Sequence, residues 1–419
     1  MKVLVIGGGG REHAIIHKLS KSNKIEKIYC APGNPGISEL AENVNILPMQ
    51  FDLLINFAKE KNIDMTIAAM DDTLVAGIVD EFEKNGLKIF GPNKKAAIIE
   101  GSKAFSKNLM KKYNIPTANY ETFSNYEDAL NYIENLNPPI VIKADGLALG
   151  KGVLICKTLD EAKENLKDIM INKKFGQSGE NVVIEEFMTG KEVSILCFCD
   201  GENIVPMVSA QDHKRAFDND EGPNTGGMGT ISPSRYYTED IAKIAMDTIF
   251  KPTIQALAKE DRHFVGVLFF GLMLTDEGPK VIEYNARFGD PETQVVLPRL
   301  KTDLIDIMEA CLNKTLNDIN IEWEDYATSC VILASGGYPE SYEKGYEIKG
   351  LNQAKDLKDV FIYHAGTTIK DNKIVNNGGR VLGIMAKGES LEKALEKSYN
   401  ALNIVYFKDS FYRKDIGKR

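Results

Sequence analysis

The chain has 419 residues, of which 43% are hydrophobic and 26% are charged, and its formal net charge is −9. This length predicts two to four domains, and the composition is that of a folded globular protein. The acidic balance excludes a nucleic acid or an anionic membrane surface as the main partner, and no apolar run is long enough to span a membrane.

The first hundred residues alternate between strand and helix patterns. These patterns predict strands at residues 2–6, 25–30, 65–69 and 87–90, and helices at 11–20, 52–61 and 75–85. Because strands that alternate with helices favour a mostly parallel sheet, we expect an N-terminal α/β domain over residues 1–101.

The rest of the chain mixes strands and helices less regularly. We predict strands at residues 138–144, 153–157, 182–187, 265–274, 280–285, 328–334 and 381–386. Helices are predicted at 102–113, 159–170, 240–259, 302–313 and 390–402. We therefore expect a central α+β domain over residues 102–325, with a flap subdomain at about 115–187, and a C-terminal α+β domain over 326–419.

Four consecutive glycines, residues 7–10, end the first strand and open the first helix, where free N–H groups can bind a phosphate. The dinucleotide fingerprint G-x-G-x-x-G is absent, because Glu12 occupies its sixth position and the second strand runs into Ala31 rather than an acidic residue. The loop is either a small phosphate-ester site, with Arg11 as its cation, or only a tight turn. An NAD-dependent oxidoreductase stays the alternative from another enzyme class.

A second glycine-rich loop spans residues 146–152 between two predicted strands. A Walker loop would need another glycine spacing, Ser or Thr after Lys151, and a helix behind it. We interpret the loop as a flap that folds over phosphates, or as a simple hairpin tip. Lys143 ends the preceding apolar strand, and its burial requires a compensating anion.

Three acidic residues follow in the central region. The strand at 182–187 turns acidic at Glu185 and Glu186, where backbone groups could read an adenine edge, or where the two side chains could simply be solvated. Glu192 could accept hydrogen bonds from ribose hydroxyls.

The most informative segment is residues 280–287. Strand alternation puts Glu283, Asn285 and Arg287 on one face, together with Val281. Glu and Asn offer the oxygen ligands that suit Mg²⁺, and Arg287 would meet a carboxylate or a transferring phosphoryl oxygen.

The loop over residues 212–229 brings two cations and four glycines together, so it is a candidate basic site or an ordinary surface loop. None of the five histidines pairs with a plausible nucleophile, so we expect no Ser-His or Cys-His hydrolase. The six scattered cysteines lack metal-binding spacing and indicate reduced thiols in a cytoplasmic protein.

Together these stretches resemble the ATP-grasp superfamily, and within it the glycinamide ribonucleotide synthetase family of phosphoribosylamine–glycine ligases. The similar stretches are VIGGGGREHA, APGNPG, GPNKKAA, IVIKADGLALGKGV, DHKRAFD, GPNTGGMG and VIEYNARFGDPETQ, with GGRVLGIMAKG near the end. The resemblance implies a Rossmann-like N-terminal domain, an ATP-grasp domain with a mobile glycine-loop subdomain, and a small C-terminal α+β domain.

The resemblance also implies a reaction. ATP would phosphorylate the glycine carboxylate, and 5-phosphoribosylamine would attack the glycyl phosphate to give glycinamide ribonucleotide, ADP and phosphate in the second step of purine synthesis. Arg287 and Lys214 would be catalytic, and Glu283 and Asn285 would bind Mg²⁺ or Mn²⁺. The implied ATP contacts are Lys103, Lys143, Gly146, Lys151, Glu185, Glu186, Phe187 and Glu192. The implied contacts of the other two substrates are Gly9, Gly10, Arg11, Asn34, Pro35, Gly36, Asp212, Asn224, Gly226, Gly227, Gly289 and Asp290.

One position departs from the superfamily, because Gly271 stands where many members place a further metal-binding Glu. The number of metal ions and any third ligand therefore stay open. The alternatives to the implied ligase are another ATP-grasp carboxylate–amine ligase of purine synthesis and a nucleotide sensor without turnover. We expect a cytoplasmic monomer that acts on small molecules.

Titration of the protein with NADH, followed by nucleotide fluorescence, tests the oxidoreductase alternative. Because Glu12 and Ala31 break the dinucleotide pattern, we expect no saturation in the micromolar range. A micromolar dissociation constant for NADH would contradict our interpretation of the first glycine cluster.

Overall fold

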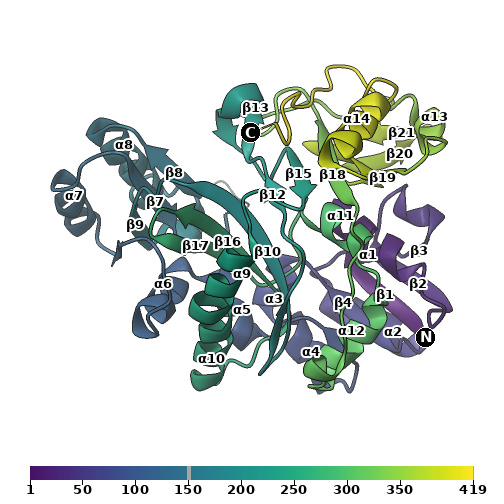
Figure 1. The fold of residues 1–419 in the computed structure, drawn as a ribbon, viewed down its shortest axis with the longest axis horizontal. Coiled ribbons are helices and arrows are strands. Elements are labelled where there is room, and N and C mark those ends of the chain that lie inside the picture. The colour runs from purple at the N-terminus through teal and green to yellow at the C-terminus, as the bar shows by residue number, and fades with distance from the viewer. Residues whose placement is uncertain (149–151, 419) are drawn as a thin grey trace.

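The computed structural model describes residues 1–148 and 152–418. In Figure 1 the N-terminal elements (purple) lie at one end, helices α7 (Tyr126–Glu134) and α8 (Leu159–Met170) lie at the other, and the C-terminal elements (yellow) pack above the purple ones. Within the described ranges, no helix has both the length and the apolar character needed to cross a bilayer.

The N-terminal sheet is parallel, with the strand order β3-β2-β1-β4-β5, which confirms the expected Rossmann-like arrangement. Its strands are β1 (Lys2–Gly7), β2 (Lys27–Pro32), β3 (Glu42–Asn43), β4 (Met65–Ala68) and β5 (Ile89–Phe90). Strand β1 is buried on both faces, because Val3 and Val5 join one hydrophobic core while Leu4 and Ile6 join another. This explains why its sequence is a continuous apolar run.

The helices of this domain are α1 (Gly10–Leu19), α2 (Phe51–Lys61), α3 (Asp71–Ala76), α4 (Ile78–Lys84) and α5 (Lys94–Gly101). The prediction of one helix over residues 75–85 is wrong. Gly77 has a φ of 97°, a left-handed conformation that ends α3 and starts α4.

The central region contains two four-stranded antiparallel sheets. The first has the order β6-β9-β7-β8 and consists of β6 (Tyr120–Phe123), β9 (Val182–Glu186), β7 (Ile140–Ala144) and β8 (Val153–Cys156). The second has the order β11-β10-β16-β17 and consists of β11 (Ile204–Pro206), β10 (Lys191–Asp200), β16 (Val265–Thr275) and β17 (Gly278–Asn285). The first sheet has its own hydrophobic core with α7 and α8.

Helix α7 and strand β6 were not predicted. Strand β6 is only partly buried and shows no alternation, so its sequence carries little signal. The sequence of helix α7 does carry a signal, because Asn125 is a favourable N-cap residue. Its side chain accepts hydrogen bonds from the N–H groups of Glu127 and Asp128.

Four other predicted helices are observed at or near their predicted residues in the central and C-terminal regions. The predicted helix at 240–259 is observed as α9 (Glu239–Ala245) and α10 (Lys251–Lys259), joined by the π-helical turn Met246–Phe250. The predicted helices at 102–113, 302–313 and 390–402 are observed as α6 (Lys103–Lys112), α12 (Leu304–Leu312) and α14 (Leu391–Leu402). The short helices α5, α11 (Thr293–Val296) and α13 (Leu351–Lys355) were not predicted.

A β-bulge changes the predicted face of β17. Gly271 pairs with Glu283 and Leu272 pairs with Val281, so Ile282 is the extra residue. Val281 therefore packs in the core and does not share a face with Glu283, contrary to the simple alternation.

The C-terminal sheet has the order β12-β15-β18-β22-β19. It consists of β12 (Gln211–Asp212), β15 (Gly229–Ser232), β18 (Ala327–Ala334), β22 (Arg380–Gly388) and β19 (Val360–His364). Two hairpins accompany it, β13 (Arg215–Phe217) with β14 (Glu221–Asn224), and β20 (Thr367–Lys370) with β21 (Lys373–Asn376). The sheet takes strands from both sides of the predicted boundary at 325/326, which stays a prediction.

The N-terminal and C-terminal units meet at Asn34 and Gly36. The Asn34 amide donates to the carbonyls of Gly8 (2.9 Å) and His364 (2.8 Å). A Cβ on Gly36 would lie 2.4 Å from His364 Cδ2 and 2.7 Å from His13 Cε1, and both rings are buried.

We predict that Gly36→Ala destabilises the protein by about 1–3 kcal/mol, because the added methyl group overpacks this interface. Urea unfolding measures the change. The matched control is Ser38→Ala, whose side chain is exposed in the same turn, and it should change the stability by less than about 0.5 kcal/mol. Equal stability of the Gly36 variant and the wild type would contradict the packing described here.

Candidate active site

A buried carboxylate, Glu185 on β9, lies between two lysines. Its oxygens are 2.9 Å from Lys143 Nζ on β7 and 3.0 Å from Lys107 Nζ on α6. Lys143 Nζ also donates to the carbonyl of Ile282 (3.0 Å). The anion that the burial of Lys143 requires is therefore Glu185, which is 3% exposed and not a solvated strand end.

Lys107 was not predicted as a site residue. Burial lowers the pKa of Lys107 to about 8, although Glu185 acts in the opposite direction. Lys107 lies four residues after Lys103 and so on the same face of α6, which is the sequence signal that could have indicated it.

Lys103 connects α6 to the second glycine loop. Its Nζ donates to the Gly146 carbonyl (2.9 Å), and burial lowers its pKa. Gly146 packs against Ser178, and both border a cavity of about 320 Å³. Lys151, the predicted phosphate contact of this loop, lies outside the described residues.

Glu186, the last residue of β9, and Phe187, just after the strand, turn outward. The Glu186 carboxylate accepts hydrogen bonds from the backbone N–H (3.0 Å) and the side-chain amide (2.9 Å) of Asn119. Phe187 is 39% exposed. Their side chains therefore do not join the lysine cluster, although the predicted role of this segment concerns its backbone.

Lys214 joins Glu192 and Glu283. Its Nζ lies 3.3 Å from the Glu192 carboxylate and 3.2 Å from that of Glu283. Burial alone would lower the pKa of Lys214, but these carboxylates and Asp212 raise it well above its usual value. Lys214 in turn lowers the pKa of Glu283 to about 2, despite burial, with Lys143 and Lys103 contributing. Glu283 is thus fully ionised at neutral pH.

Arg287 faces Asn285 and Glu100. Its guanidinium donates to Asn285 Oδ1 (3.2 Å) and the Phe288 carbonyl (3.2 Å), and it lies 3.1 Å from the Glu100 carboxylate. Its Nε is buried and has no partner among the described residues. Burial raises the pKa of Glu100. Glu100 was not predicted as a site residue.

Glu283 and Asn285 fit a divalent cation such as Mg²⁺. They offer one ionised carboxylate and one amide oxygen, and the described ranges hold no group of three or more His, Cys, Asp or Glu side chains that could bind a metal. An ion with few protein ligands, completed by substrate phosphates and water, suits Mg²⁺.

The first glycine loop approaches the same region. The Glu12 carboxylate caps α1 by accepting from the Gly9 N–H (2.8 Å) and pairs with Arg11 (2.7 Å), so Glu12 uses the position where the dinucleotide fingerprint has glycine. Arg11 also donates to the Phe288 carbonyl (3.1 Å). Gly10 packs against Gln294, which donates to Asp290 (2.7 Å).

Arg380 on β22 reaches this cleft from the C-terminal unit, and sequence reasoning assigned it no role. It donates to the carbonyls of Gly226 (2.6 Å) and Asp290 (2.8 Å), and it lies 3.2 Å from the Asp290 carboxylate. The Gly226 N–H donates to the Tyr338 hydroxyl (3.1 Å). Arg380 and Arg11 lower the pKa of Asp290 against the effect of burial.

The other predicted substrate residues are more peripheral. Asn224 pairs with Arg215 in the β13–β14 hairpin, and Pro35 is partly buried beside Asn34. Gly227 and Gly289 lie against the carboxylates of Asp212 and Glu292 respectively.

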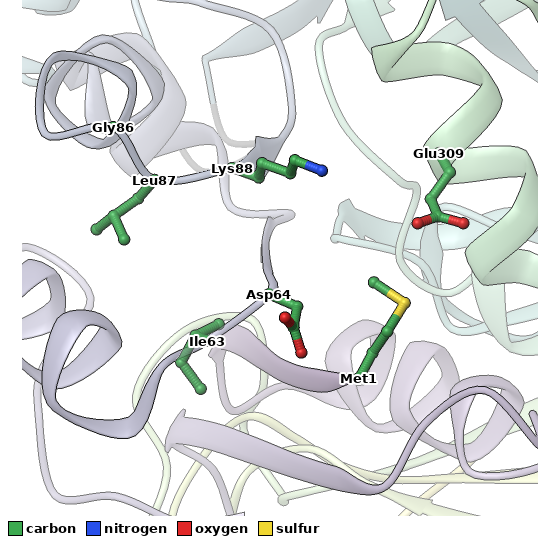
Figure 2. Close-up of a pocket in the computed structure, with 7 residues that line it drawn as sticks. All are labelled: Met1, Ile63, Asp64, Gly86, Leu87, Lys88 and Glu309. Carbon is green, nitrogen blue, oxygen red and sulfur yellow. The ribbon is translucent and has the colours of Figure 1, made fainter.

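A second cavity, of about 430 Å³, lies apart from these residues. Figure 2 shows its lining by Met1, Ile63, Asp64, Gly86, Leu87, Lys88 and Glu309. It is at the amino ends of β1, β4 and β5, whereas α/β sheets bind ligands at the carboxyl ends, where the glycine loop lies. We assign no role to it.

Three family models match the chain. They are the N domain (residues 1–100), the ATP-grasp (A) domain (101–293) and the C domain (328–419) of phosphoribosylglycinamide synthetase. The chain belongs to the phosphoribosylglycinamide synthetase family. Its central domain type indicates use of ATP together with a divalent metal ion.

Individual relatives and solved structures are consistent with this family assignment. A phosphoribosylamine–glycine ligase from Caldanaerobacter subterraneus subsp. tengcongensis is 54% identical over 416 residues, which is 99% of each chain. The crystal structure of a phosphoribosylamine–glycine ligase from Thermotoga maritima has 34% identity and a TM-score of 0.84, over 99% of this chain and 100% of that one. The MgADP-bound biotin carboxylase domain of the Hydrogenobacter thermophilus 2-oxoglutarate carboxylase shares the fold, with 16% identity and a TM-score of 0.72 over 98% and 91%.

We predict that Glu185→Gln destabilises this synthetase-family protein by about 3–5 kcal/mol, because it leaves two buried ammonium groups without their counter-charge. The matched control is the neighbouring Glu186→Gln, whose side chain is exposed, and it should cost less than about 0.5 kcal/mol. Urea unfolding of both variants measures the difference, and similar losses would show that Glu185 does not compensate the lysines.

Proposed function

We propose that the chain catalyses the ATP-dependent ligation of glycine to 5-phosphoribosylamine, giving glycinamide ribonucleotide, ADP and phosphate. The observation that carries this proposal is the pair of Lys214 and Glu283, with Arg287 four residues further along the same segment, in an ATP-grasp domain. The shared family and the names of the full-length relatives support the choice of substrates.

The geometry suits phosphoryl transfer to a carboxylate. Lys103 and Lys143 would neutralise the nucleotide phosphates, and Glu192 would accept from the ribose. Arg287, whose buried Nε lacks a partner among the described residues, would bind the glycine carboxylate and the phosphoryl group that moves onto it. A carboxylate resists attack by an amine, so this activation must precede amide formation.

Glu283 and Asn285 would hold the divalent cation, Mg²⁺ or Mn²⁺. The chemistry supplied by such an ion is neutralisation of phosphate charge. The low pKa of Glu283, about 2, keeps this ligand ionised. Lys214 would lie beside the same phosphates, since it already contacts Glu192 and Glu283.

The second substrate would bind where three parts of the chain converge. The Gly9–Arg11 loop, the Gly226–Gly227 turn and Asp290 approach one another there, and Arg380 links the last two. We infer that Arg380 joins the predicted residues in holding phosphoribosylamine. The site would have to hold its phosphate without help from the overall charge, which is −9.

We also infer a cytoplasmic setting. All six cysteines are free and buried, and burial raises the pKa of each thiol, which fits a reducing compartment. The other ATP-grasp ligases of purine synthesis stay the second candidate, and activation of formate or bicarbonate with glycine inert would favour them.

The protein should release ADP from Mg-ATP only when glycine and phosphoribosylamine are both present. Glu283→Gln should lower kcat/KM by about 100-fold or more while the protein still binds ATP, because a metal ligand is lost from the reacting centre. A coupled ADP assay and ATP titration measure both effects. Glu277→Gln, on the exposed turn of the same hairpin, is the matched control.

Failure of the folded wild type to release ADP with all three substrates would overturn the proposed function. A wild type that binds ATP without turnover would favour the nucleotide sensor.

A further inference from the structure

The loop that carries Lys214 contains a hairpin with little support of its own. Strands β13 and β14 form a separate sheet of two strands, and Lys214 immediately precedes the first of them. A two-stranded hairpin is marginally stable in water unless other parts of the chain pack on it. At its tip, Asn219 (φ 64°) and Asp220 (φ 57°) both adopt the left-handed conformation, which adds to the cost. The place of Lys214 therefore depends on contacts from outside the hairpin.

Residues 411–418, which we call the strap, supply such contacts. The Lys414 N–H donates to Asp218 Oδ1 (2.7 Å). The Asn219 N–H donates to Asp415 Oδ2 (2.9 Å). Because Asn219 is one of the two left-handed residues, the strap stabilises the tip of the hairpin in the conformation that costs most.

Arg413 of the strap contacts both the base and the tip of the hairpin. Its side chain is 1% exposed, and Nη1 donates to the backbone carbonyl of Arg215 (3.1 Å), the residue after Lys214. The same guanidinium donates to Asp415 through two bonds of 2.9 Å, and its Nη2 lies 2.9 Å from Asp220 Oδ1. A guanidinium presents its donors in one rigid plane, so these contacts fix the hairpin and the strap relative to each other.

His213, the residue before Lys214, is held by the strap as well. Its Nδ1 donates to the Gly229 carbonyl (3.0 Å), because a carbonyl oxygen can only accept. Its Nε2 is then unprotonated and accepts from the Gly417 N–H (3.1 Å) of the strap. Burial lowers the pKa of His213, which keeps the ring in the neutral form that these two contacts require. The strap therefore holds the residues on both sides of Lys214.

The placement of Lys214 matters because its ammonium group lies between two carboxylates of the proposed site. Its Nζ lies 3.3 Å from Glu192 and 3.2 Å from Glu283. A lysine side chain is flexible, so the backbone on either side decides whether the ammonium group stays between these acids. A misplacement of about 1 Å at a reacting centre can lower a rate about 100-fold.

We propose that Arg413 is a positioning residue, which together with the rest of the strap fixes the backbone on both sides of Lys214 and so places its ammonium group at the reacting phosphates. This inference rests on the proposed function. It makes the rate of phosphoryl transfer depend on a side chain 198 positions further along the chain than Arg215, which it contacts. Arg413 acts through Lys214 and not on a substrate.

A double-mutant cycle on the full chain tests this proposal, with ADP release measured at saturating substrates. Arg413→Gln should lower kcat about 10- to 100-fold, because Lys214 loses its place. In a Lys214→Met background the same substitution should change kcat by less than about twofold, since a residue that acts through Lys214 then has nothing to position. Lys414→Gln, which changes the exposed neighbour of Arg413 in the strap, is the matched control and should behave as the wild type.

Arg413→Lys separates position from charge. Lysine keeps the buried positive charge but lacks the fork of donors, so it cannot hold both carboxylates and the Arg215 carbonyl. We expect this variant to unfold near the urea concentration of the wild type and still to lose kcat about fivefold or more. If Arg413→Gln does not fold, the cycle is measured with Arg413→Lys.

Equal losses from the Arg413 substitution with and without Lys214 would overturn the proposal, because they would show a general effect on stability. Wild-type kcat in either folded Arg413 variant would also overturn it. Failure of the wild type to release ADP would instead refute the proposed ligase reaction, and the cycle is then measured on the dissociation constant of Mg-ADP by calorimetry. There the Arg413 substitution should weaken binding about fivefold alone and less than about twofold in the Lys214→Met background, and equal losses would overturn the positioning role.

Discussion

A buried cation must lie beside an anion, and this requirement organises the cleft. Glu185 compensates two lysines that come from different elements, α6 and β7, and thereby fixes the first central sheet against α6. Glu283 does the same for Lys214, and Glu100 for Arg287. The protein can therefore gather cations for phosphorylated substrates while its overall charge stays negative, because each of these cations is already partly neutralised before a ligand binds.

The chemical groups proposed for the site could be recognised in the sequence because they follow one another at short, regular spacing. Glu283, Asn285 and Arg287 alternate along one short segment, and a carboxylate, an amide and a guanidinium so placed suit a metal ion beside an anion. The same reasoning failed for Val281, since a bulge at Ile282 shifts the strand by one residue, and nothing in the local sequence reveals it. The parallel N-terminal sheet could also be predicted from the sequence, because its strands are apolar runs separated by helices.

Contacts between residues that are far apart in the sequence could not be predicted in this way. Lys107 meets Glu185 across 78 positions of sequence only because α6 and β9 pack together. Arg380 reaches Gly226 and Asp290 from the last sheet of the chain, although its own motif was recognised. Sequence thus identifies chemical groups well and their pairing poorly.

The C-terminal sheet borrows β12 and β15 from the segment that also carries Asp212 and Lys214. If the chain were cut between residues 325 and 326, β18 would lose its neighbour β15 and have an exposed edge in one fragment. In the other fragment, β12 and β15 would be separated from the rest of their sheet. The segments that match separate family models are therefore not separate structural units, because one sheet contains strands from two of them. Exchange of the last module between relatives would require exchange of β12 and β15 as well, and with them a portion of the proposed substrate site.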